Sequence, residues 1–321
     1  MLHPRLPDVA QSSLVLRPFL ATAFRSRHTV AWKPNSAPNS ASIILQFLPA
    51  ADRTRQFQHR IFPSVSAPSA VQRYFATSPT MSNANDSDPA VSQPLADLFA
   101  KAEAEFPPRF REHGWYLTVL ASFVGTGQQQ LAGSLYTHLV AQPQYQTSEA
   151  RQALVRRMRE ALVKCIIING IPVVIEAVTS ISDVEKPEDR DYSCSRADWQ
   201  IGPENSERAA KVLKVLYKSE KGGHVKTLQS HLDIPWISAN VSYGLFLSDH
   251  RILTMQETEL VVLPAIMTQN LRGPTYWHLR ACLRVGMEAE EVEAVHKVIE
   301  VVAAHGGKTL EVQRVKDVTD A

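Results

Sequence analysis

ELVVLPAIMTQNLRGPTYWHLRACLRVG, residues 259–286, contains the clearest structural pattern of the chain. Glu259 opens an apolar helix, a turn with a Gly-Pro pair falls near 270–273, and a second helix carries His278 inward. In an antiparallel pair, Glu259 lies about ten residues before the turn and His278 about six after it, so at ~1.5 Å per residue their levels differ by only several ångströms. We therefore expect a contact between the two side chains, either directly or through water.

Glu259 and His278 are the candidate catalytic residues. A carboxylate that touches an imidazole fixes its tautomer and raises the basicity of the other ring nitrogen, which suits a general acid or base near neutral pH. Because Glu259 sits on an apolar face, it must be paired, protonated or solvated by a cavity. Structural pairing that only holds the helices in register remains the alternative. Tyr276 and Trp277 are candidate substrate-binding walls for a flat ring, with a plain core role as their alternative.

Helical periodicity continues through the rest of the chain from about Pro94. Apolar spacing predicts helices at 95–106, 115–124, 129–141, 149–169 and 207–220, short helices at 228–248, and a polar, exposed connection at 183–202. Ser148 is expected to cap the long segment, and residues 165–178, CIIINGIPVVIEAV, are apolar nearly all round, as in a helix buried at the centre of a domain. No strand-like alternation of useful length is present, so the predicted fold class is all-α.

A weak internal repeat relates Glu160 to Glu259 at an offset of 99 residues, each before an apolar run and a Gly/Pro turn. Two such halves packed face to face would bury both apolar helices in one domain. Thr179 stands in the place of His278, so Glu160 is expected to be structural or to complete the pocket from the side. The expected organisation is a leader at 1–80, a linker at 81–94, a first helical repeat at 95–182, a connecting loop at 183–206, a second repeat at 207–306 and a tail at 307–321.

Composition narrows the classes of function. The 321 residues, 44% of them hydrophobic, suffice for one sizeable core or two small ones. No apolar run reaches the roughly 20 residues that span a bilayer, and residues 81–321 show no basic patch suited to nucleic acid or a membrane surface. The cysteines Cys165, Cys194 and Cys282 are widely spaced, which favours neither disulfides nor a zinc site. We expect no metal and no cofactor, because phosphate-loop, dinucleotide and nucleophile-elbow motifs are also missing.

The first 80 residues have the composition of a mitochondrial transit peptide. They contain eight Arg and one Lys against two Asp, a net charge of +7, which leaves −5 of the total +2 for residues 81–321. Many serines and prolines and the RYFATS sequence at 73–78, similar to contexts at which presequences are cut, support this interpretation. The alternative is that translation starts at Met81, in which case a cytoplasmic location is expected. In either case we expect this segment to be disordered.

Residues 208–303, and more loosely 95–181, resemble the carboxymuconolactone decarboxylase and alkylhydroperoxidase D family. The family unit has a Glu-Leu-hydrophobic helix, a turn, a His-x-x-x-Ala-x-x-x-Gly helix and a Glu-Glu-hydrophobic segment. Here these are Glu259-Leu260-Val261, the stretch from His278 to Gly286, and Glu290-Glu291-Val292. The resemblance implies an all-helical fold of the alkylhydroperoxidase D-like type and a homo-oligomer, a trimer or hexamer.

The chain departs from this family at the redox centre. Peroxidase members place a C-x-x-C between the acid and the histidine, where this chain has Leu271 and Pro274. A disulfide peroxidase needs an attacking and a resolving thiol, so that activity is not expected. Cys282 lies one turn past His278 and lacks a vicinal partner. A small buried hydrophobe is the expected role for Cys282 rather than a one-cysteine peroxidase.

Two functions follow from these patterns. The first is a cofactor-free lyase or isomerase in which Glu259 and His278 act on a small carboxylated lactone or enone ring compound. The second is a non-catalytic helical oligomer that binds a ligand or serves as a scaffold. A solvent-connected cavity beside His278, lined by Trp277 and Glu259, would favour the first, and a closed, fully apolar space there would favour the second.

Overall fold

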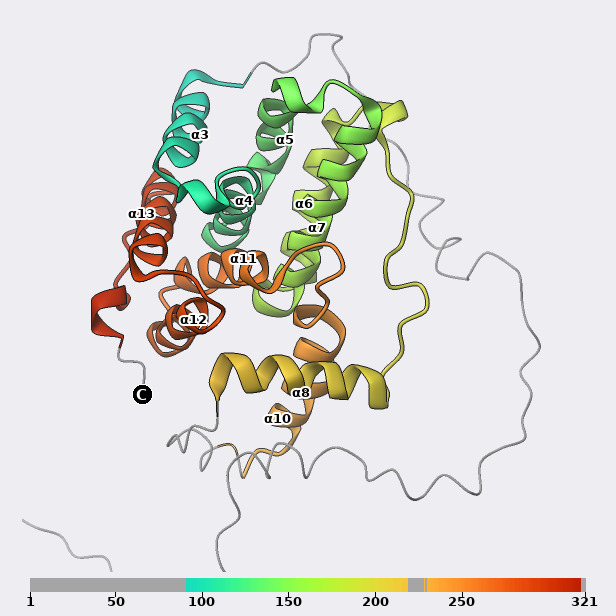
Figure 1. Cartoon of the computed structure of the whole chain (residues 1–321). Coiled ribbons are helices and arrows are strands. Elements are labelled where there is room, and N and C mark those ends of the chain that lie inside the picture. Colours follow the sequence, from blue (N-terminus) through green and yellow to red (C-terminus); the bar gives the residue numbers. More distant parts are fainter. Residues whose placement is uncertain (1–90, 219–227, 229, 319–321) are drawn as a thin grey trace, which may run out of the picture. The chain divides into compact units, whose positions relative to one another are not determined.

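The computed structural model describes residues 91–218, 228 and 230–318, and every regular element in these residues is helical (Figure 1). The predicted all-α fold class is confirmed. The expected leader, the linker before residue 91, residues 219–220 of the predicted helix at 207–220 and residues 319–321 of the tail lie outside the described residues. The helices are α3 (Gln93–Glu105), α4 (Gly114–Thr126), α5 (Ala132–Val140), α6 (Ser148–Asn169), α7 (Ile171–Val184), α8 (Pro203–Tyr217), α10 (Asp233–Ile237), the π-helix η5 (Ser238–Leu247), α11 (Met255–Met267), α12 (Arg272–Arg284) and α13 (Ala289–His305).

Local sequence signals set most of these boundaries. Pro94 lies in the first turn of α3, where its missing N–H costs nothing, and the helix ends before Pro107. Thr147, not Ser148, caps α6, because its hydroxyl accepts from the Ala150 N–H and Ser148 is already helical. The predicted helix at 129–141 begins as a short 3₁₀ turn at Gln129–Leu131 before α5.

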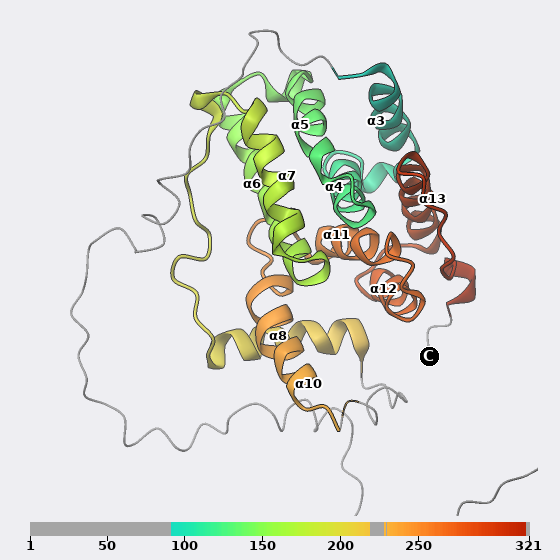
Figure 2. The same ribbon diagram turned by 180° about the vertical axis from the view of Figure 1, so that it is seen from behind.

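Helices α4 and α11 are the most buried helices of the described residues, and every residue of α4 is buried. All side chains from Thr258 to Met267 are buried, and α11 packs against α4, α6 and α12. Figures 1 and 2 show α11 between α4 and α12 from both sides. Its first turn is fixed by a reciprocal cap, in which Glu257 accepts from the Thr254 N–H and Thr254 accepts from the Glu257 N–H.

Residues 165–178 do not form the central helix that their composition predicts. Gly170, at φ 95°, separates α6 from α7, and Pro172 lies in the first turn of α7. Helix α7 runs beside α6 and α5 and buries one face only (Figure 2). Its other face is exposed and apolar, with Ile171, Ile175 and Val178 at 48%, 54% and 42%. A uniformly apolar sequence does not specify which face is covered, so tertiary contacts decide it.

The connection 183–202 is less exposed than its polar sequence predicts. Asp189 is 1% exposed and pairs with Arg151, 2.6 Å from Nε to Oδ2. The Asp191 carboxylate pairs with Arg156 and Arg159 of α6. Hydrogen bonds from Arg151 and Ser148 at Asp189, and from Ser193 and the two arginines at Asp191, hold the pKa of both aspartates below its usual range against the effect of burial. The segment is therefore fastened along α6 by its charges.

Pro264 interrupts the hydrogen bonds of α11. It has no N–H to donate to the Leu260 carbonyl, which is buried and would otherwise lose its partner. The Thr118 hydroxyl of α4 donates to that carbonyl at 3.0 Å. The Thr118 side chain thus supplies the hydrogen bond that Pro264 cannot make, and it joins α4 to α11.

Replacing Thr118 by valine is expected to lower the free energy of unfolding by about 1–2 kcal/mol, because a buried carbonyl loses its donor while the side-chain shape is kept. Urea denaturation would measure the change. Thr179→Val is the matched control, since the Thr179 hydroxyl bonds only to Ile175 of its own exposed helix face. Equal effects of the two substitutions would contradict the role assigned to Thr118.

Candidate functional site

Glu259 and His278 meet as the sequence predicts. Helix α11 ends at Met267, Asn270 adopts φ 57°, and α12 begins at Arg272, so the two helices pack against each other across a short turn. His278 Nδ1 lies 2.8 Å from Glu259 Oε2. The expected contact is confirmed, and it is direct.

The geometry of this pair fixes the tautomer of the imidazole. Glu259 is 2% exposed and His278 5%. An ionised carboxylate can only accept, so Nδ1–H donates to Glu259 and Nε2 carries the lone pair when His278 is neutral. A buried carboxylate also stabilises the imidazolium when His278 gains a second proton. The pair can therefore take up and release a proton at Nε2.

Two tyrosines extend the pair into a chain of polar groups. The Tyr217 hydroxyl of α8 lies 3.4 Å from His278 Nε2, and 2.7 Å from the Tyr243 hydroxyl of η5. Burial raises the pKa of both phenols, and the negative charge of Glu259 acts in the same direction. Both hydroxyls stay neutral, and each retains a proton that it can donate. The contact at 3.4 Å is long for a hydrogen bond, so Tyr217 engages Nε2 only weakly.

Tyr217 and Tyr243 are not predicted as site residues from the sequence, although the pattern of α8 contains a signal for Tyr217. Tyr217 continues the buried face formed by Ala209, Val212 and Leu216 at helical spacing. A tyrosine on a buried face needs a partner for its hydroxyl. That requirement points to a polar neighbour, but it does not identify His278.

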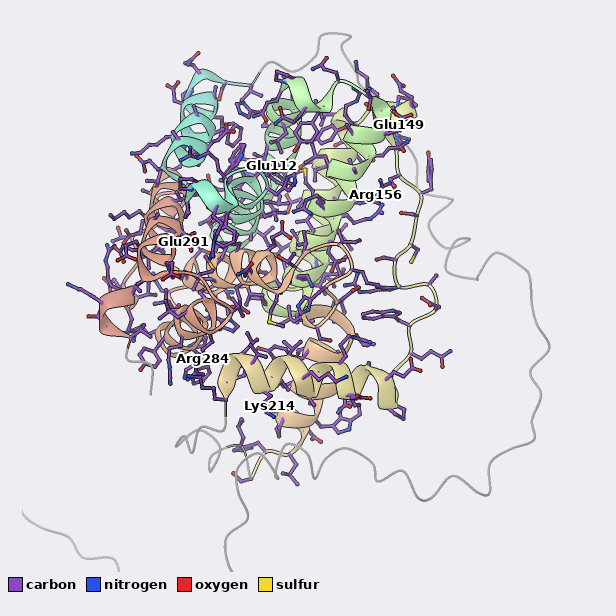
Figure 3. All side chains as sticks on the ribbon, in the orientation of Figure 1. Glu112, Glu149, Arg156, Lys214, Arg284 and Glu291 are labelled. Carbon is purple, nitrogen blue, oxygen red and sulfur yellow. The ribbon has the colours of Figure 1, made fainter. Side chains whose placement is uncertain are left out.

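A hydrogen bond joins α8 to α12 beside this chain of polar groups. Arg284, labelled in Figure 3 near the carboxyl-terminal end of α8, donates from Nη1 to the Leu216 carbonyl at 2.7 Å. The bond fixes the residue before Tyr217 against the helix that carries His278. This contact joins residues 68 apart in the sequence and holds the end of α8 that carries Tyr217 beside α12.

Tyr276 and Trp277 differ from His278 in exposure. Both are partly exposed, whereas His278 and Leu279, which follow them in the sequence, are buried. The Arg280 guanidinium lies 5.6 Å from the centre of the Tyr276 ring. The roles of Tyr276 and Trp277 in substrate binding stay predictions.

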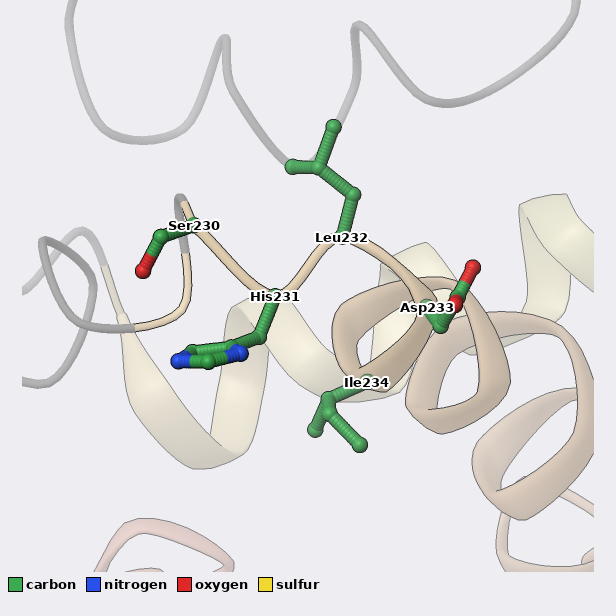
Figure 4. A pocket seen from close by; sticks show the side chains of 5 residues that line it. All are labelled: Ser230, His231, Leu232, Asp233 and Ile234. Carbon is green, nitrogen blue, oxygen red and sulfur yellow. The ribbon is translucent and has the colours of Figure 1, made fainter. Parts of the chain in front are cut away.

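The surroundings of His278 are not fully apolar, because Glu259, Tyr217 and Tyr243 line it with polar atoms. A separate surface pocket of about 420 Å³ lies at residues 230–234, where His231 and Asp233 come from one continuous stretch of chain (Figure 4). None of the candidate site residues lines that pocket. It brings together no side chains from different elements and offers no catalytic arrangement.

Glu160, the counterpart of Glu259 in the repeat, has cationic partners instead of a histidine. Its carboxylate is 2% exposed and accepts two hydrogen bonds from Arg196, each at 2.7 Å. Lys164, which is fully buried, lies 3.2 Å away. Thr179, in the place of His278, lies on the exposed face of α7. The prediction that Glu160 has no histidine partner in its own half is consistent with these contacts.

The cysteines differ sharply in accessibility. Cys165 and Cys282 are buried, and Cys194 is exposed. Burial raises the pKa of the Cys165 thiol to about 12 and that of Cys282 well above its usual value, with Glu259 adding to the shift at Cys282. A thiolate at Cys282 is therefore disfavoured, which opposes a peroxidase role.

A thiol titration of the native chain with a disulfide reagent is expected to detect one reactive cysteine, Cys194, and three after unfolding. Cys194→Ser should remove the native signal completely. Rapid native modification of the Cys194→Ser chain would contradict the burial of Cys165 and Cys282.

In the part of the chain that the structure describes, no three side chains of His, Cys, Asp or Glu gather in a way that could hold a metal ion. Among the helices described, none has both the length and the apolar character needed to cross a membrane.

The sequence is distantly similar to a known protein. Peroxisomal protein 2 of Schizosaccharomyces pombe is 25% identical over 143 residues, which cover 44% of this chain and 66% of the relative. The chain thus spans just under two thirds of that protein. No protein-family model matches the sequence, and no solved structure matches it.

Proposed function

We propose that the protein is a cofactor-free lyase or isomerase of the carboxymuconolactone decarboxylase type, acting on a small carboxylated lactone or enone. The direct contact between Glu259 and His278 is the observation that carries the proposal. It leaves Nε2 as the proton-transfer atom and provides a buried negative charge for the imidazolium. Tyr217 and Tyr243 add neutral hydroxyl donors beside the same nitrogen.

The substrate must be its own electron sink. Decarboxylation breaks the bond between a ring carbon and its carboxylate, releases carbon dioxide, and moves the electron pair into the conjugated carbonyl. The imidazolium of His278 then transfers its Nε2 proton to the carbon, and Glu259 stabilises the cation before this transfer. A proton from solvent restores the imidazolium, so each turnover consumes one proton for each carbon dioxide released. Isomerisation would use the same atom to remove and return a proton as a double bond shifts.

The test is release of carbon dioxide by the full-length chain from a panel of carboxylated lactones and enones. Release above the uncatalysed rate with at least one substrate supports the proposal. Absence of release from every substrate, by a folded protein, would favour the second function.

The second function is a non-catalytic helical oligomer that binds a ligand or acts as a scaffold. The exposed apolar stripe of Ile171, Ile175 and Val178 on α7 favours it, because such stripes are common in contacts between proteins. We also propose that the chain forms a homo-oligomer, a trimer or hexamer, in either function. Sedimentation velocity of the purified chain tests this, and a monomer at micromolar concentration would reject it.

The composition of residues 1–80 and the name of the relative both bear on the location of the protein. We propose import into mitochondria when residues 1–80 are present and a cytoplasmic location when translation starts at Met81. The name of the relative, Peroxisomal protein 2, makes peroxisomes the competing site. Imaging of the full-length chain and of a chain starting at Met81, each with a fluorescent tag, distinguishes these locations.

A further inference from the structure

Trp199 lies in the segment between α7 and α8, and three arginine side chains contact its ring system. The guanidinium carbons of Arg208, Arg251 and Arg196 lie 4.0, 4.4 and 5.3 Å from the centre of its rings. Each contact is individually favourable, because a cation is attracted to an aromatic face. Together, however, they bring three like charges close to one another.

Two buried carboxylates neutralise part of this charge. Glu160 pairs with Lys164 and Arg196, and Asp249 pairs with Arg196 and Arg251. Asp249 is only 2% exposed, and these cations hold its pKa below the usual range against the effect of burial. Both carboxylates are thus already engaged by neighbouring cations.

Arg208 belongs to the same cluster of cations as Arg196, Arg251 and Lys164, but its hydrogen-bond partners are neutral. It donates to Ser248 Oγ at 3.2 Å and to the Gly244 carbonyl at 2.8 Å. Among the described residues, no carboxylate lies at ion-pair distance from it. Burial lowers the pKa of Arg208, and the charges of Arg251 and Arg196 act in the same direction, while two carboxylates at longer range oppose them. An anion at Arg208 would relieve this repulsion.

A pocket of about 510 Å³ opens at this position. Polar groups of Arg208, Lys211, Ser248, His250 and Arg251 line it, and Trp199 forms part of its wall. Asp249 lines it too, but its carboxylate is already paired with Arg196 and Arg251. His250 Nε2 is buried and has no hydrogen-bond partner among the described residues. The pocket therefore combines an unpaired guanidinium with an unsatisfied ring nitrogen, a hydroxyl and an ammonium group.

We propose that the pocket beside Trp199 binds the phosphate group of a small molecule, with Arg208 as its principal anchor. A phosphate dianion matches the excess of positive charge, and its oxygens can accept from donors in several directions, as arginine, lysine and serine provide here. Val212 and Met255 supply apolar wall for the organic part of the ligand. The volume lies in the range of about 300–1,000 Å³ that is usual for small-molecule sites. This site is distinct from the Glu259 and His278 pair and does not depend on the proposed reaction.

Calorimetric titration of the full-length chain with phenyl phosphate tests the proposal, with benzoate as the carboxylate of the same ring. We expect phenyl phosphate to bind wild type, and benzoate to bind more weakly. Arg208→Gln should weaken phenyl phosphate binding by at least about tenfold, because a charge-assisted fork is lost. Arg272→Gln is the matched control, since it removes one arginine from an exposed position outside the pocket and should change nothing.

Lys211→Gln keeps the test decisive if Arg208→Gln does not fold. Lys211 is exposed and pairs only with exposed Glu207, so its replacement should leave the fold intact. It should weaken phenyl phosphate binding by about threefold in low salt. Absence of phenyl phosphate binding to wild type, tighter binding of benzoate, or equal weakening by Arg272→Gln would each overturn the proposal.

Discussion

His278→Ala is expected to lower carbon dioxide release by at least about a hundredfold, because general acid–base catalysis of this kind contributes factors of roughly 10²–10⁴. The substitution removes Nε2, the only proton-transfer atom of the proposed step, and leaves the Glu259 carboxylate in place. The measurement is the rate of release from the best substrate at saturating concentration. Loss of rate without a comparable rise in KM is expected, since the proton is transferred in the reaction step and not on binding.

Two further variants separate the chemical role of His278 from its structural role. Glu259→Gln keeps the size of the partner but removes the negative charge that stabilises the imidazolium, so the rate should fall. The alkaline limb of the pH–rate profile, where the imidazolium loses the proton that it donates, should move to lower pH. Tyr217→Phe removes a hydroxyl near Nε2 and should have a smaller effect. A pH–rate profile unchanged by Glu259→Gln would contradict the role assigned to the carboxylate.

His296→Ala is the matched control for His278→Ala. His296 of α13 is also a buried histidine, 1% exposed. Its Nε2 lies 3.1 Å from the Gln313 carbonyl. Its loss should lower stability but leave the rate unchanged. If both alanine variants lowered the rate equally, the effect of His278→Ala would be attributed to folding and the catalytic proposal would be rejected.

Glu160→Gln is expected to cost about 3 kcal/mol of unfolding free energy, within the range found when one member of a buried ion pair is removed. Lys164 would remain fully buried, with the carbonyls of Phe246 and Asp249 as its acceptors at 3.1 and 2.8 Å. Burial lowers the pKa of Lys164, and the Glu160 carboxylate acts in the opposite direction. The amide cannot supply that charge, so the ammonium group would lose its principal stabilisation.

Glu207→Gln provides a control with the same spacing and the same chemistry. Glu207 pairs with Lys211 one turn later at 2.9 Å, as Glu160 pairs with Lys164, but both partners are largely exposed. Water and salt replace such a contact, so no measurable change is expected. Chemical denaturation of the two variants beside wild type makes the comparison. A similar stability for both would show that burial of Glu160 does not carry the energy assigned to it.

The sequence alone predicts the helical class and the contact between Glu259 and His278. The helical class depends on apolar periodicity along the chain. The contact depends on spacing within one short stretch, where 1.5 Å of rise per residue and a turn near 270–273 leave few arrangements. The structure places the turn there, with Asn270 at positive φ and α12 beginning at Arg272. Local geometry of this kind depends only on the spacing of residues along the sequence, so it can be derived before any tertiary contact is known.

Only the tertiary structure decides which side chains from distant segments share an environment. Tyr217 reaches His278, and Arg196 reaches Glu160, because α8 and the segment before it fold back over the earlier and later helices. The same holds for 165–178, where the sequence is apolar on all sides and only the position of neighbouring helices leaves Ile171 exposed. The sequence pattern indicates that a helix face is apolar, or that a charge on such a face needs a partner. It does not state which element will cover that face or neutralise that charge, because this depends on contacts between residues far apart in the chain.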